Sequence, residues 1–185
     1  MLAYHQAPPY WVPMRFFVTA PLFAVLAGLT LVVYGPDALA HRWDPMTLAL
    51  SHLLALGFLA MTMFGALLQL VCVLLAVQPP WLTLVATLAH GTLTAGTLAL
   101  AAGLAFGAPW LLHVAQALLA SGVAAFIASV ALALARSEAR TATLRGIALS
   151  LIAMAFTTGL GLGLAQAISQ GLEVPLIKFT GYHAG

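Results

Sequence analysis

The stretch that decides the fold is LSHLLALGFLAMTMFGALLQLVCVLL, residues 50–75. It contains no Asp, Glu, Lys or Arg. A helix needs about 20 mostly apolar residues to cross the hydrocarbon core of a bilayer, and this run is longer than that. It therefore predicts a transmembrane helix that tilts or protrudes. Its apolarity is continuous, which excludes a transmembrane β-strand, because such strands alternate over about ten residues.

The composition of the whole chain supports the same assignment. Of 185 residues, 63% are hydrophobic and 5% are charged, whereas soluble domains carry about 25% charged residues. This composition excludes a soluble globular protein, and also a disordered chain, which needs low hydrophobicity and high charge. The net charge of +2 comes from six scattered basic residues, so a nucleic-acid partner is not expected. The expected surroundings are a lipid bilayer.

Four further apolar runs flank the first one, separated by turns rich in Gly and Pro. We predict one all-α integral membrane domain over residues 1–185, a bundle of five transmembrane helices at about 14–34, 46–77, 81–106, 109–135 and 143–170. Asp44 is the expected N-cap of the second helix. Pro45 follows as its first residue, where the missing N–H costs nothing.

The basic residues predict the orientation of the bundle. Arg15, Arg136, Arg140 and Arg145 lie on one side of the predicted spans, and Arg42 and Lys178 lie on the other. Cytoplasmic loops carry the excess of basic residues. We therefore expect the N-terminus inside and the C-terminus outside.

Three of the six histidines fall within predicted spans: His52, His90 and His113. An ionisable residue in a membrane helix is costly, so each is a functional candidate. At about 1.5 Å per residue, His52 and His113 lie within a few ångströms of the same depth. Two axial ligands of one heme must share a depth on facing helices. His52 and His113 are therefore the predicted heme-binding and metal-binding pair.

His90 allows two interpretations. It lies at the depth of Gln69 on the preceding helix, and a hydrogen bond between the two would explain it structurally. A role as a metal ligand stays open. The other three histidines, His5, His41 and His183, lie outside the predicted spans and are expected to be solvated.

Other patterns narrow the chemistry. The chain has one cysteine, Cys72, which excludes a covalent c-type heme site and predicts a buried apolar packing residue. No Asp or Glu lies within a predicted span, which disfavours a proton pump. Small-residue pairs at helical spacing predict close helix packing, within the chain or between copies; they are Gly57 with Gly65, Gly103 with Gly107, and Gly159 with Gly163.

Residues 50–75 resemble the second-helix region of the heme-copper oxidase subunit I superfamily and its short relatives, including membrane heme proteins of the NnrS type. The shared features are His52 at the outer end, Leu56-Gly57 a turn later, then Gly65-Ala66 and Gln69 in the inner half. The preceding segment also resembles the first helix of such relatives, in Pro13-Met14-Arg15-Phe16-Phe17, Ala20-Pro21-Leu22 and Arg42-Trp43.

The resemblance covers about the first 80 to 90 residues and implies a heme-ligand role for His52 alone. The large oxidases hold copper with histidines on later helices, including an adjacent His-His pair that this chain lacks. Cys72 also stands where the relatives usually have proline. Oxygen or nitric oxide reductase activity therefore does not carry over, and the sequence leaves open whether the chain is an enzyme.

The expected function is that of a membrane b-type heme protein in a bacterial inner membrane, acting in electron transfer or in binding NO or O₂. It would work as a homo-oligomer or as a subunit of a respiratory membrane complex. Two alternatives stay open at this point. One is a structural or assembly subunit without redox chemistry. The other is a copper-binding membrane protein that uses His52, His90 and methionines, since imidazole also suits copper.

Overall fold

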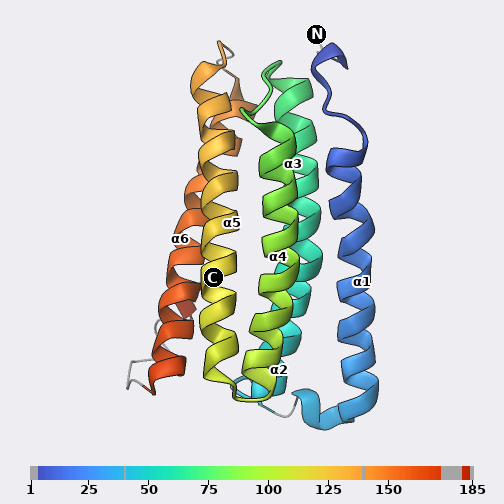
Figure 1. Cartoon of the computed structure of the whole chain (residues 1–185), viewed down its shortest axis with the longest axis vertical. Coiled ribbons are helices and arrows are strands. Elements are labelled where there is room, and N and C mark those ends of the chain that lie inside the picture. The colour runs from blue at the N-terminus through green and yellow to red at the C-terminus, as the bar shows by residue number, and fades with distance from the viewer. Residues whose placement is uncertain (1–3, 40, 139–140, 172–180, 184–185) are drawn as a thin grey trace.

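A computed structural model describes residues 4–39, 41–138, 141–171 and 181–183. Its described elements are all helical, as Figure 1 shows. They are η1 (Tyr4–Gln6), α1 (Trp11–Tyr34), η2 (Gly35–Leu39), α2 (Pro45–His52), η3 (Leu53–Ala60), α3 (Met61–Leu74), α4 (Leu82–Ala105), α5 (Pro109–Arg136) and α6 (Ala142–Gln170).

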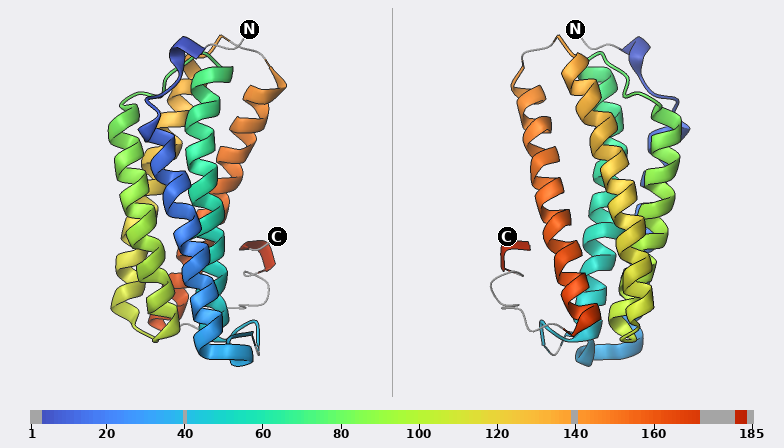
Figure 2. Two further views of the ribbon diagram at one scale, coloured as in Figure 1. Left: turned by 90° about the vertical axis from the view of Figure 1, so that its right-hand side faces the viewer. Right: turned by 60° about the vertical axis from the view of Figure 1, so that its left-hand side comes forward.

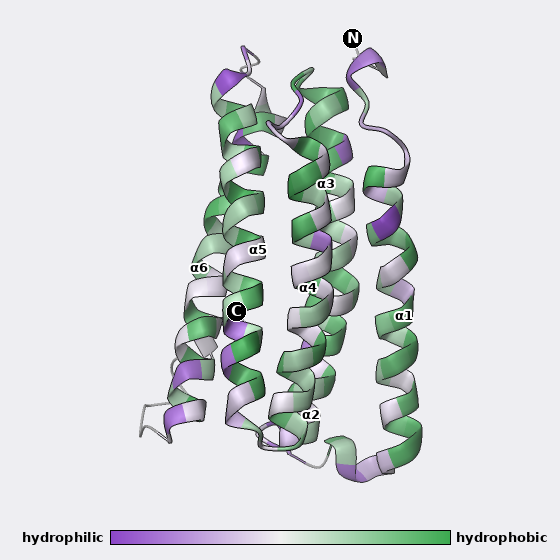
Figure 3. Ribbon diagram, in the orientation of Figure 1, coloured by the Kyte–Doolittle hydropathy of each residue, from purple (hydrophilic) through white to green (hydrophobic). Residues whose placement is uncertain are grey.

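Five helical stretches in the described residues are long and apolar enough to cross a membrane, which confirms the predicted all-α, five-helix membrane bundle. The outer surface of the bundle is apolar along most of its length, and the strongly polar residues gather mainly near its ends (Figure 3). Large side chains such as Val32, Leu149 and Phe156 are exposed on it. An apolar surface of this extent belongs in lipid.

The second span is one long helix with an unusual middle. Asp44 caps it as predicted, with its Oδ1 accepting a hydrogen bond from the Met46 N–H at 3.1 Å. Between α2 and α3, however, the segment η3 is a π-helix. A π-helix packs more residues into each turn than an α-helix. The hydropathy pattern cannot reveal this, because every residue of η3 is apolar or glycine.

Helix α1 lies against the second span, and two glycines set how closely it approaches. A Cβ built on Gly57 would overlap the ring of Phe23, and one on Gly65 would lie 2.9 Å from the Phe16 Cβ. Both glycines thus face α1, as their spacing predicts. The centroid of the Phe16 ring also lies 6.4 Å from that of Phe64 on α3 and 5.2 Å from that of His90 on α4, so α1 packs against both helices.

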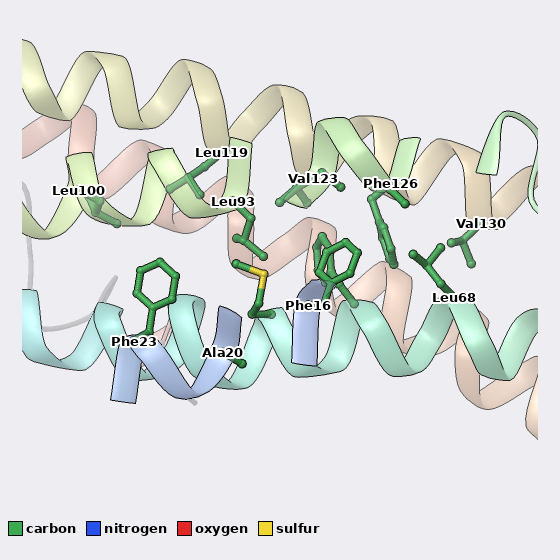
Figure 4. Close-up of a cluster of buried hydrophobic side chains, with 14 of the residues drawn as sticks. Phe16, Ala20, Phe23, Leu68, Leu93, Leu100, Leu119, Val123, Phe126 and Val130 are labelled. Atoms are coloured by element: carbon green, nitrogen blue, oxygen red, sulfur yellow. The ribbon is translucent and has the colours of Figure 1, made fainter. Parts of the chain in front are cut away.

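The core of the bundle is a column of apolar side chains from α1, α3, α4 and α5 (Figure 4). Its centre is the pair Phe64 and Phe126, whose rings stack with centroids 4.0 Å apart. Helices α4 and α5 form the closest hairpin, because Gly103 and Gly122 leave no room for a side chain at their contact. Cys72 is fully buried, as predicted for a packing residue.

Helix α6 stands at the edge of the bundle, packed mainly against α5 (Figures 1 and 2). Only 11% of its membrane-spanning window is buried. A Cβ on Gly159 or Gly163 would meet nothing within 4 Å. That small-residue pair therefore does not serve packing within the described part of the chain.

Replacing Gly57 with alanine tests the contact between α1 and the second span. The added Cβ has no room beside Phe23, and overpacking of this kind typically costs about 1–3 kcal/mol. The control is Gly91→Ala on α4, where a Cβ meets nothing within 4 Å and helix propensity improves by up to about 1 kcal/mol. The free energies of unfolding, measured in detergent by circular dichroism, should separate the two variants; equal stabilities would contradict this packing.

Candidate functional site

His52 is held in a defined orientation at the point where α2 passes into the π-helix η3. Its Nδ1 lies 2.7 Å from the carbonyl oxygen of Leu48, one turn earlier. A carbonyl only accepts hydrogen bonds, so Nδ1 carries the proton and Nε2 of the neutral ring keeps its lone pair. Histidines that bind metals commonly use one ring nitrogen this way, donating to a backbone carbonyl while the other binds the ion.

The π-helix beside His52 is a second feature of the site. Segments of π-helix in membrane and soluble proteins often mark functional positions, because they shift side chains out of the regular α-helical register. Here the shift begins directly after His52, at Leu53. The side chain of His52 is half-buried between the second span and its neighbours.

His183 lies beside His52, which the sequence did not predict. The two imidazole rings have centroids 6.3 Å apart and planes inclined by only 19°. The Nδ1 of His183 donates to the carbonyl oxygen of Thr157 on α6 at 3.0 Å. His183 therefore shares the tautomer of His52, and its Nε2 also keeps a lone pair.

Gly161 on α6 makes the room for His183. A Cβ at this position would lie 2.7 Å from Cε1 of the His183 ring and 3.4 Å from both ring nitrogens. The ring thus rests on a bare stretch of the α6 backbone. Residues 181–183 form a helical turn beside the bundle, close to α6 in Figure 2. A histidine outside the long apolar runs carries no hydropathy signal, so only the three-dimensional structure reveals this contact.

His113 lies at a different contact, between α5 and the C-terminal end of α6. It is exposed, and its Nε2 lies 3.4 Å from the Ser169 hydroxyl. Gln116, one turn later, lies 3.5 Å from the Leu162 carbonyl oxygen through its Nε2. Among the described residues, no contact joins His113 to His52. His113 as the second ligand therefore stays a prediction without a contact to support it.

His90 faces α1 and not Gln69. Its Nε2 lies 2.9 Å from the Thr19 hydroxyl, and the edge of Phe16 meets its ring at 85°. Gln69 is exposed on α3. The predicted hydrogen bond between Gln69 and His90 is replaced because α1 lies between the two helices. A hydrogen bond to threonine satisfies the buried ring and is a structural role.

The set of possible metal ligands around His52 is small. Among the described residues, no group of three or more His, Cys, Asp or Glu side chains gathers to hold a metal ion. A structural or catalytic zinc site needs at least three such ligands. A heme iron needs one or two axial ligands from the protein, and a neutral imidazole with a lone pair on Nε2 is one of the side chains that can serve as such a ligand.

No protein-family model, curated protein or solved structure matches this chain.

Proposed function

We propose that the protein is a membrane heme protein in which His52 is an axial ligand of a non-covalently bound heme b. One observation supports this above the others: the Nδ1 proton of His52 is fixed on the Leu48 carbonyl at 2.7 Å, which leaves Nε2 free to bind iron. The resemblance of residues 50–75 to the second helix of heme-copper oxidases favours the same role.

The chain's own residues would set the properties of the site. The Leu48 carbonyl holds the His52 ring in one tautomer and one orientation, as outer partners of ligating histidines do. A bound heme would supply one-electron transfer, or the binding of NO or O₂.

The setting we propose is a bacterial inner membrane with the N-terminus inside and the C-terminus outside. The arginines Arg15, Arg136 and Arg145 support this orientation, since basic residues mark the cytoplasmic side; Arg140 and Lys178 lie outside the described residues. Among the described residues, nothing covers Gly159 and Gly163 on α6, which favours a homo-oligomer or a place in a larger membrane complex.

An absorption spectrum of the protein purified from membranes tests the proposal. We expect a Soret band and, after reduction, the α-band of a b-type heme. A colourless, metal-free protein would contradict the proposal and favour a structural or assembly subunit. Copper in elemental analysis without a Soret band would instead favour a copper-binding protein.

Two other histidines of the spans have hydrogen-bond partners. His90 bonds to Thr19, and His113 lies within reach of Ser169. These contacts favour a structural role for both residues.

A further inference from the structure

We infer that His183, and not His113, is the second ligand of the site, so that His52 and His183 bind one metal centre through their Nε2 atoms. This inference rests on the proposed function of His52. The metal centre is heme iron or a bare ion that prefers imidazole, and the experiment below distinguishes the two.

The hydrogen bonds of the two rings carry the inference. Each ring uses Nδ1 on a backbone carbonyl, His52 on Leu48 at 2.7 Å and His183 on Thr157 at 3.0 Å. Backbone carbonyls cannot donate, so both neutral rings present a lone pair on Nε2. Two half-buried imidazoles side by side, each with a lone pair on Nε2 and no proton to share between these atoms, are a pair of donors that one bound cation can use together.

The distance between the rings is also suitable. Their centroids are 6.3 Å apart. Two metal–nitrogen bonds of about 2.0–2.1 Å each, extended by the distance from each nitrogen to its ring centre, separate two imidazoles on one ion by roughly 6 Å. The separation of the two ring centroids therefore matches that of two imidazoles on one ion.

His113 lacks these features. Its ring is exposed, and its Nε2 lies within reach of the Ser169 hydroxyl rather than free. Its contacts lie at the outer end of α6. His183 instead meets α6 at Thr157 and Gly161, which at about 1.5 Å per residue is more than 10 Å further along the helix.

Electron paramagnetic resonance of the whole chain loaded with hemin tests the assignment. The wild type should give the low-spin ferric signal of bis-imidazole ligation. His183→Ala should lose that signal and become high-spin, and free imidazole should restore the low-spin form. His113→Ala should leave the spectrum unchanged. The readout is the ligand field of the iron, so a merely structural role for His183 would not reproduce it.

A second pair of variants leaves both ligands in place. Gly161→Leu fills the space in which the His183 ring rests, whereas Gly163→Leu projects where a Cβ meets nothing within 4 Å. We expect Gly161→Leu to lose most of the low-spin signal and Gly163→Leu to keep it. Equal spectra in the two variants would contradict the placement of His183 on α6.

The remaining outcomes separate this inference from the proposed function. A wild-type protein that binds hemin in a purely high-spin form, or a low-spin signal lost in His113→Ala but kept in His183→Ala, overturns the inference and leaves the heme proposal standing. A wild-type protein that takes up no hemin overturns the heme proposal. Titration with Cu(I) then decides: reduced affinity in both His52→Ala and His183→Ala supports a shared ion, and wild-type affinity in either variant overturns it.

Discussion

Replacing His52 with alanine is expected to abolish heme retention while the bundle stays folded. The imidazole is the one group on the second span with a fixed tautomer and a free lone pair, and the chain offers no covalent attachment that could keep the heme without it. Heme content per mole of purified protein, from the pyridine hemochrome spectrum, measures the loss. Circular dichroism on the same sample establishes that the helices remain.

His90→Ala is the matched control, because it removes another histidine from the membrane-spanning part of the chain. It breaks the hydrogen bond to Thr19 and the edge contact with Phe16. A hydrogen bond of this kind is worth about 1 kcal/mol, so we expect lower stability and full heme content. Wild-type heme content in folded His52→Ala would remove the basis of the proposed site, and loss of heme in His90→Ala alone would move the site to α1 and α4.

The sequence was sufficient to predict the membrane bundle because continuous apolarity is a long-range signal. Runs such as residues 50–75 can be satisfied only by helices in lipid, and Asp44 and Pro45 placed a helix start through local backbone chemistry alone. The π-helix at Leu53–Ala60 has no corresponding signal in the sequence. It changes which backbone groups bond to one another, and this does not alter the hydropathy of the segment.

Only part of the candidate site could be predicted from the sequence. His52 stands out because an imidazole in an apolar run is costly, and its bond to Leu48 is local to one helical turn. Matching depths along two helices could not reveal which helices are neighbours. Thr19 reaches His90 because α1 inserts between α3 and α4, and His183 reaches His52 across α6. Both contacts depend on how whole helices are arranged.

Replacing Phe126 with alanine is expected to produce the largest loss of stability in the chain. Its side chain is fully buried and stacks on Phe64 at the centre of the core. In soluble proteins such a change costs about 3–5 kcal/mol, part of it for the transfer of apolar surface and part for the cavity left behind. Lipid is as apolar as the core, so the transfer part largely vanishes and the lost packing remains. We therefore expect the lower end of that range.

Phe156→Ala is the matched control. It removes the same side chain, but from the lipid-facing surface of α6, where Phe156 is 62% exposed. The difference between the two variants isolates the contribution of packing. It should shift the free energy of unfolding by no more than about 0.5 kcal/mol. The double variant Phe64→Ala/Phe126→Ala should cost less than the sum of the single changes by about 0.5–1.5 kcal/mol, the typical coupling of a stacked aromatic pair. Equal losses for Phe126→Ala and Phe156→Ala would mean that Phe126 faces lipid, and that α5 does not meet α3 through these two rings.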